Sequence, residues 1–100
     1  MIGWLKGKLL VTEGNTAVID VSGVGYEVIV PARLIEYWKT QKQTDVSVSV
    51  YTNVRENSIE LFGFESSWEK QVFLLLTSVS GVGPRTALSV INALKPDQII

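Results

Sequence analysis

The segment with the clearest capacity for chemistry is the turn Gly81-Val82-Gly83, which an apolar run precedes and Pro84 follows. The two glycines permit positive φ and let the backbone come close to a partner. Pro84 suits the first position of a helix, where its missing N–H is not needed. The free amides of that helix start lie at the positive end of the helix dipole, so together with Arg85 they suit a phosphate group.

The residues alone leave two interpretations of this turn. One is an ordinary corner between two helices with a glycine at the helix C-terminus. The other is a phosphate-binding hairpin, and the spacing of several further residues favours it. This spacing resembles the helix-hairpin-helix motif, which binds nucleic-acid backbones without reading sequence. The apolar, glycine and small positions that match the motif are Leu76, Val79, Gly81, Val82, Gly83 and Ala87. The predicted phosphate-binding residues are Ser80, Gly81, Val82, Gly83, Arg85 and Thr86.

The composition of the chain excludes several other kinds of functional site. The 100 residues include no cysteine and no histidine, which excludes disulfides, thiolate chemistry, zinc fingers and histidine-based catalysis within this chain. The Gly81–Thr86 stretch lacks the Gly-Lys-Ser/Thr ending of a nucleotide-binding loop, so nucleotide hydrolysis must come from a partner. The acidic residues Asp20, Glu27, Asp45, Glu56 and Glu60 are scattered without metal-ligand spacing. We therefore expect no catalytic residue, no metal and no cofactor.

The hydrophobic and charged fractions of the sequence indicate a folded chain. Hydrophobic residues make up 46% of the sequence, which is enough to form a core. Charged residues make up 19%, and a chain this apolar is not expected to be disordered. The net charge of −1 is no sign of nucleic-acid binding, but residues 66–100 carry three basic and two acidic side chains, and backbone amides hold phosphates without a large positive field. Lys6 and Lys8 interrupt the apolar N-terminus, and no apolar run reaches the length of a membrane span. These features predict a cytoplasmic protein without a membrane partner.

The first 64 residues predict a small β-barrel. We expect strands at residues 1–12, 16–21, 26–30, 45–54 and 59–64, and a helix at 32–39. Residues 45–54 alternate strictly in period two, which is typical of a strand with one buried face. Gly3 and Gly7 suggest a bend or bulge in the first strand. A five-stranded OB-fold is the leading interpretation, although the pattern also allows an SH3-like barrel or a small sandwich.

From Ser66 onward the hydrophobic period becomes helical. Ser66 and Glu69 have the spacing of a capping box. We expect two packed apolar stripes, one formed by Trp68, Val72, Leu75, Leu76 and Val79 and the other by Ala87, Leu88, Ile91 and Leu94. Residues 95–97 predict a break and residues 98–100 the start of another helix. The expected domains are 1–64, an OB-fold barrel, and 65–100, the incomplete first part of a helix-hairpin-helix domain in a truncated chain.

The segments 1–3, 20–28, 54–57, 61–64 and 81–87 closely resemble the RuvA family, in the same order along the chain. The resemblance implies an OB-fold barrel followed by the first hairpin of a second domain. It also implies a non-catalytic subunit that binds four-way (Holliday) junction DNA in recombination and repair. The implied assembly is a homotetramer that works with the RuvB ATPase, engaged through a C-terminal domain absent from this chain, and with the RuvC resolvase.

The same resemblance gives a role to the turn Arg55-Glu56-Asn57. In the family, two acidic residues that follow an arginine form a central pin that repels phosphates and helps to separate strands. Here Glu56 matches the first acidic residue and Asn57 replaces the second, so the pin carries half the charge per subunit. Arg55 is expected to contact DNA. From the residues alone, the turn is an ordinary polar hairpin in which asparagine tolerates the left-handed conformation.

The tryptophans bear on a rival function, a generic OB-fold module that binds single-stranded nucleic acid or another protein. Such a module needs exposed aromatic rings on a barrel face for base stacking. Trp38 and Trp68 are expected to pack helices instead, and the role of Trp4 stays open. Preference for four-way junctions over duplex and single strands would separate the two functions.

Overall fold

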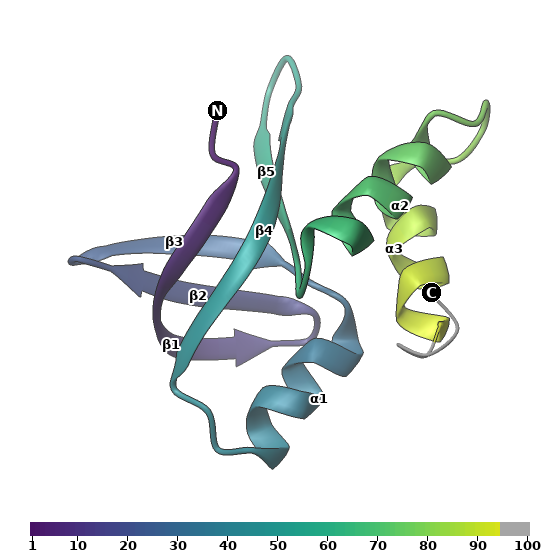
Figure 1. Ribbon diagram of the computed structural model, residues 1–100. Coiled ribbons are helices and arrows are strands. Elements are labelled where there is room, and N and C mark those ends of the chain that lie inside the picture. Colours follow the sequence, from purple (N-terminus) through teal and green to yellow (C-terminus); the bar gives the residue numbers. More distant parts are fainter. Residues whose placement is uncertain (95–100) are drawn as a thin grey trace.

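Five strands close into a barrel in the computed structural model, which describes residues 1–94 (Figure 1). The neighbours run in the order β1-β2-β3-β5-β4, and β4 pairs with β1 to complete the circle. The strands are β1 (Trp4–Glu13), β2 (Thr16–Val21), β3 (Val24–Ile29), β4 (Asp45–Val54) and β5 (Ile59–Phe64). The helices are α1 (Ala32–Thr40), α2 (Ser67–Thr77) and α3 (Pro84–Ala93). The prediction of an OB-like barrel followed by helices is confirmed.

A two-residue turn fixes the register of β2 and β3. Ser22 and Gly23 both have positive φ, 52° and 92°, as the tightest hairpin turns require. The Asp20 carboxylate accepts a 2.7 Å hydrogen bond from the Gly23 N–H, which holds the turn closed. Val21 therefore pairs with Val24, and β3 begins two residues earlier than the expected strand at 26–30.

The first strand carries the irregularity that its glycines suggested. Its pairing with β2 shifts between Leu9 and Val11, so the bulge lies beyond Gly7 rather than at it. Gly7 serves a different purpose. A Cβ at this position would lie 2.2 Å from the carbonyl oxygen of Asp20, so only glycine allows β1 to pass this close to β2.

The barrel core is apolar and α1 packs onto it at one end (Figure 1). Leu34, Ile35 and Trp38 lie on the buried face of α1 and join the barrel cluster, in agreement with the predicted stripe of this helix. Trp38 is 3% exposed, which confirms its predicted role in packing.

A second buried cluster joins the barrel to the two C-terminal helices. Phe73 of α2 lies with its ring centroid 4.9 Å from that of Phe64 and 5.2 Å from that of Phe62, both on β5. The α3 members of the cluster are Ala87, Leu88 and Ile91, as the sequence predicted. The helices thus pack on the outside of the strand that ends the barrel.

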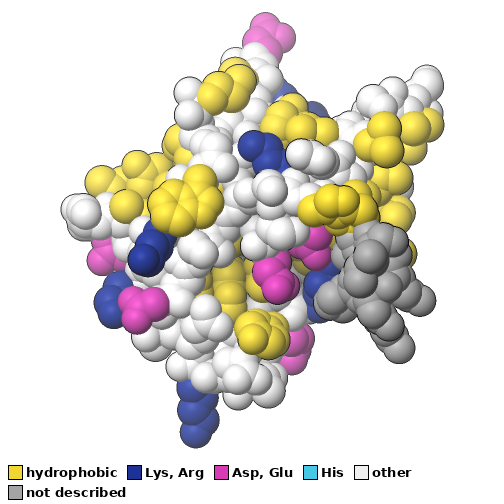
Figure 2. All heavy atoms as spheres, viewed as in Figure 1, with side chains coloured by type: hydrophobic (Ala, Val, Ile, Leu, Met, Phe, Trp, Pro, Cys, Tyr) yellow, Lys and Arg dark blue, Asp and Glu magenta, His cyan; other side chains and the backbone are white. Residues whose placement is uncertain are grey.

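The predicted apolar stripe of α2 was partly wrong. Trp68, Leu75 and Val79 are 46%, 70% and 55% exposed, and only Val72 and Leu76 pack against the second cluster. The reason is that the helix turns the face around Phe73 toward β5, so Trp68 does not have its predicted packing role. Figure 2 shows hydrophobic side chains on the surface in this part of the molecule.

The ends of the helical pair also differ slightly from expectation. The second helix ends at Thr77, two residues before the expected end, and Leu94 is the C-terminal cap of α3 rather than part of its packed face. The predicted break at 95–97 and the predicted helix at 98–100 lie outside the described residues. No helix within residues 1–94 is long and apolar enough to cross a membrane.

Candidate nucleic-acid interface

The turn between α2 and α3 has the backbone geometry of a tight helical hairpin. Gly81 has a φ of +85°, and the Val82 N–H donates a 3.1 Å hydrogen bond to the Val79 carbonyl. Gly83 is extended, with φ −88° and ψ 173°, and precedes Pro84 at the first turn of α3. Of the two glycines that permit positive φ, only Gly81 uses it, because Gly83 is the residue from which the new helix starts.

The start of α3 leaves backbone amides without an acceptor in the helix. Ala87 makes the first intrahelical bond, donating to the Gly83 carbonyl at 3.0 Å, and no side chain caps this end. Pro84 has no N–H, so the N–H groups of Arg85 and Thr86 precede that bond and remain available to a ligand. The predicted residues Ser80, Gly81, Gly83, Arg85 and Thr86 are exposed, and Val82 is half-buried.

The absence of a side chain at Gly83 is not required by the fold. A Cβ built there would meet no atom within 4 Å, and the backbone is in a conformation open to any residue. The space beside Gly83 is open, and it lies next to the available amides. This is the place where an outside group can come close to the helix start.

The side chain of Arg85 already has an acidic neighbour on the barrel. Its guanidinium lies 3.5 Å from the Glu60 carboxylate of β5, with the two side chains 64% and 28% exposed. Thr16, Glu27 and Glu60 line a hollow beside Arg85 between the barrel and α3. In the sequence, Glu60 is only one of several scattered acidic residues, because nothing in the local pattern links a β5 residue to a helix 25 positions later.

The turn between β4 and β5 forms the second predicted site. Arg55, Glu56 and Asn57 are all exposed, and the Arg55 N–H donates a 2.8 Å hydrogen bond to the Ser58 carbonyl. The non-glycine residues with positive φ in the described part of the chain are Ser22 and Lys42, so Asn57 does not adopt the left-handed conformation that it was expected to tolerate.

The two predicted sites project in the same direction without touching. In Figure 1 the β4–β5 turn and the α2–α3 turn both extend toward the top of the view, separated by a gap. An acidic side chain stands at the tip of the β4–β5 hairpin in Figure 2. Residues 55–57 and 80–86 therefore form two separate protrusions on one side of the molecule.

The remaining sequence candidates have simpler environments. Lys8 pairs with Asp45 at 2.7 Å, with both side chains well exposed, so this lysine is part of a solvated ion pair. Trp4 is 60% exposed. Within residues 1–94, no group of three acidic side chains could hold a metal ion.

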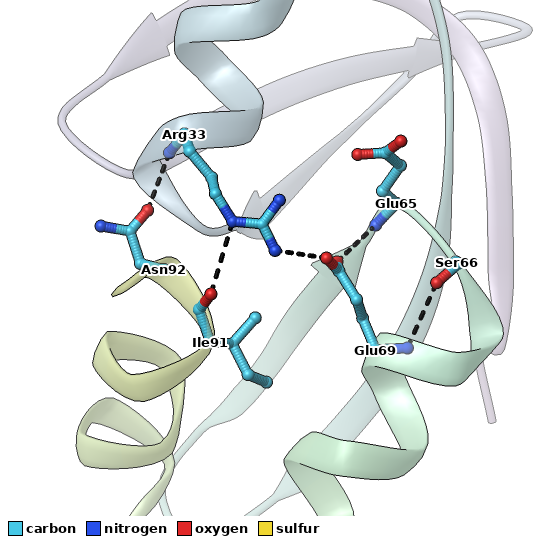
Figure 3. Close-up of polar contacts among 6 residues, drawn as sticks. All are labelled: Arg33, Glu65, Ser66, Glu69, Ile91 and Asn92. Carbon is cyan, nitrogen blue, oxygen red and sulfur yellow. Dashed lines mark hydrogen bonds and ion pairs between the residues drawn. The ribbon is translucent and has the colours of Figure 1, made fainter. Parts of the chain in front are cut away.

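The predicted capping box at Ser66 and Glu69 is confirmed in one of its two hydrogen bonds. The Ser66 hydroxyl accepts a 3.2 Å hydrogen bond from the Glu69 N–H, as predicted. The Glu69 carboxylate does not return to Ser66, however. It accepts a 3.3 Å bond from the Glu65 N–H and forms an ion pair with Arg33 of α1 (Figure 3).

A closed OB-like barrel followed by a helical pair defines the structural class of this chain. The family model of the RuvA N terminal domain matches residues 1–63. Three similar relatives carry the name Holliday junction branch migration complex subunit RuvA. The protein of Bdellovibrio bacteriovorus is 42% identical over 99% of this chain and 50% of its own length. The corresponding values are 40%, 99% and 49% for Pelobacter propionicus and 44%, 99% and 46% for Zymomonas mobilis.

The chain belongs to the RuvA family, because the family model covers more than half of it and relatives above 30% identity cover nearly all of it. It spans about half the length of the curated relatives that it matches. The resemblance stated from the sequence is thereby confirmed.

Proposed function

We propose that this chain binds four-way (Holliday) junction DNA as a non-catalytic part of a branch-migration complex, in recombination and repair. Family membership and the printed names of the relatives support the proposal. The observation that carries it is the start of α3, where the unpaired amides of Arg85 and Thr86 stand beside the open space at Gly83.

The proposed contact is between these amides and DNA phosphates. A phosphate oxygen accepts from the Arg85 and Thr86 N–H groups and benefits from the positive end of the helix dipole. Gly83 lets the phosphate approach, while Ser80, Gly81 and Val82 form the adjoining edge of the turn. Such contacts fix the position of the duplex without reading its bases, so binding depends on the shape of the DNA.

The β4–β5 turn is proposed to act at the junction centre. Glu56 faces solvent at the turn, beside Arg55 and Asn57. Four subunits around one junction would bring four Glu56 carboxylates together where strands must part. Their repulsion of phosphate reaches about one Debye length, ~8 Å at physiological salt. Asn57 adds no charge, and Arg55 would hold phosphates that approach from the side.

The proposed assembly is a homotetramer, because a junction has four arms and one subunit supplies the contacts to one arm. The exposed apolar side chains of Trp68 and Leu75 on α2, and of Val79 just after it, form a surface suited to subunit contact, together with the barrel. ATP hydrolysis would come from RuvB, bound through a C-terminal domain, and resolution from RuvC, in the cytoplasm. We propose 1–64 as the barrel domain and 65–100 as the first part of a helix-hairpin-helix domain.

The experiment that tests this function compares three DNA ligands by fluorescence anisotropy. These are a four-way junction, a linear duplex with the same arm sequence and the corresponding single strand. We expect the junction to bind most tightly, independently of its sequence, with affinity falling as salt rises. Tightest binding to the single strand would instead support a generic OB-fold module.

A further inference from the structure

We propose that Arg33 is a positioning residue, which holds the phosphate-binding turn at one fixed angle on the barrel. This inference rests on the proposed function, because it concerns how the same DNA site is presented. Arg33 lies in the first turn of α1, in a different part of the chain from any residue predicted to touch DNA.

Arg33 contacts both C-terminal helices at once (Figure 3). Its backbone N–H donates a 2.8 Å hydrogen bond to the Asn92 side-chain oxygen, and its Nε donates at 3.4 Å to the Ile91 carbonyl. The same guanidinium forms an ion pair with the Glu69 carboxylate of α2. One side chain on the barrel helix therefore joins the beginning of α2 to the end of α3.

The partner of Arg33 is itself held in place. Glu69 is fixed at both ends, by the Ser66 hydroxyl at its N–H and by the Glu65 N–H at its carboxylate. The side chains of Arg33 and Glu69 are only 22% and 7% exposed, so water and salt screen the pair much less than a surface pair. The planar guanidinium accepts only a narrow range of geometries, which makes this contact directional.

The apolar contact between the barrel and the helices is less directional. Phe73 packs against Phe62 and Phe64, and apart from the modest geometric preference of aromatic pairs, hydrophobic burial depends on the area removed from water rather than on orientation. The cluster therefore keeps the helices on the barrel, whereas the fork of Arg33 selects their angle. We assign the two tasks to different residues for this reason.

The position of the clamp makes its angle important. It holds the ends of α2 and α3 that lie opposite the 78–83 turn (Figure 1). A ten-residue helix such as α3 is about 15 Å long, so a tilt of roughly 10° at the clamp moves the turn by about 3 Å. A displacement of that size separates an amide from its phosphate.

The effect should depend on how many hairpins the DNA must engage. A linear duplex can bind one hairpin, whereas a four-way junction requires four at matching angles. If loss of the clamp leaves the aligned orientation populated about one third of the time, each engaged hairpin loses about threefold in affinity. A junction on four hairpins then loses about 80-fold, against about threefold for duplex. The ratio of the two affinities therefore reports positioning.

The test uses Glu69→Gln in the whole protein, with Glu65→Gln as the matched control. Both changes remove one carboxylate, but the Glu65 side chain is exposed and contributes only its backbone N–H to the network. The chain has no cysteine, so cysteines introduced at the exposed Gln41 and Ser89 take spin labels that measure the distance between α1 and α3. Each variant is assayed for this distance distribution and for junction and duplex affinity.

We expect Glu69→Gln to broaden the distance distribution and to lower the junction-to-duplex affinity ratio by tenfold or more, and Glu65→Gln to change neither. An unchanged ratio, or an equal loss on both DNAs, would overturn the proposal. If Glu69→Gln does not fold, Arg33→Lys is used instead. This substitution keeps the positive charge but removes the planar guanidinium, so we expect a smaller drop in the junction-to-duplex affinity ratio. An unchanged ratio in this variant would overturn the proposal. Absence of junction preference in the unaltered protein would refute the proposed function alone, since the distance distribution still tests the clamp.

Discussion

Two glycines in barrel strands and the glycine at the start of α3 have opposite surroundings. A Cβ at Gly7 would lie 2.2 Å from a backbone oxygen, and one at Gly63 would lie 2.6 Å from the Val28 side chain. A Cβ at Gly83 would meet nothing within 4 Å. Gly7 and Gly63 lie where neighbouring strands and side chains leave no room for a Cβ, whereas Gly83 leaves an open space that the fold itself does not need. The open space at Gly83 leaves the start of α3 accessible to an outside group, which supports the proposed phosphate contact.

The largest effect is expected inside the barrel. Gly63→Val forces a branched side chain into Val28 and Val48, and such overpacking lowers the free energy of unfolding by about 3 kcal/mol. Gly3→Val is the control, because a Cβ at Gly3 meets no atom within 4 Å and should change stability by less than about 0.5 kcal/mol. Chemical denaturation measures both. Equal stability of the two variants would contradict the conclusion that packing requires a glycine at position 63.

At the α2–α3 turn we expect a substitution to lower the affinity for junction DNA and to leave the stability of the fold unchanged. Gly83→Thr adds a β-branched side chain at a helix N-cap where threonine and glycine are about equally favourable. The added atoms block the approach to the amides, and loss of one hydrogen bond to a charged group corresponds to about tenfold in affinity. Anisotropy with junction DNA and thermal denaturation measure the two effects. Unchanged junction binding by the folded variant would remove Gly83 from the site.

A smaller effect, of about two- to fivefold, is expected at the β4–β5 turn, since exposed charges interact weakly. Glu56→Gln should tighten static junction binding by removing repulsion, and Asn57→Asp should loosen it by adding a carboxylate. Both effects should be greatest at low salt, where screening is weakest. Junction affinity across a salt series measures them. If neither variant differs from the unaltered protein at any salt concentration, the turn is an ordinary hairpin.

The smallest effect is expected at Glu60, which faces Arg85 from the barrel. Glu60→Gln frees the guanidinium for phosphate and removes a nearby negative charge. Because the Arg85 side chain is mostly exposed and the two charged groups are 3.5 Å apart, the gain in junction affinity should be about twofold. The same assay measures it, and weaker binding by this variant would show that Glu60 orients Arg85 rather than competing for it.

Much of the fold follows from patterns within short segments. Period-two alternation and turn residues indicated the strands, and the buried face of α1 was correct down to Trp38. Such features are local, because a strand or helix shows its buried face in its own spacing. The face of α2 was partly wrong, since Phe73 has aromatic partners on β5 that the spacing of α2 alone does not reveal.

The candidate site also has features that the sequence could predict and features that it could not. Gly81, Pro84 and the open start of α3 could be predicted, because they depend on backbone preferences of neighbouring residues. The contacts of Arg33 with Glu69 and of Glu60 with Arg85 could not, because they join residues 36 and 25 positions apart that only the packed barrel brings together. The capping-box pattern even assigned the Glu69 carboxylate to a different partner.

Hydrogen–deuterium exchange with and without four-way junction DNA tests the central claim most directly. If the α2–α3 turn holds phosphates through its amides, saturating junction DNA should slow exchange most strongly in peptides spanning residues 80–86, with a smaller effect at 55–58. A duplex at equal concentration should protect the same peptides less. Protection confined to the barrel surface around Trp4, with residues 80–86 exchanging at the rate of the free protein, would contradict the account.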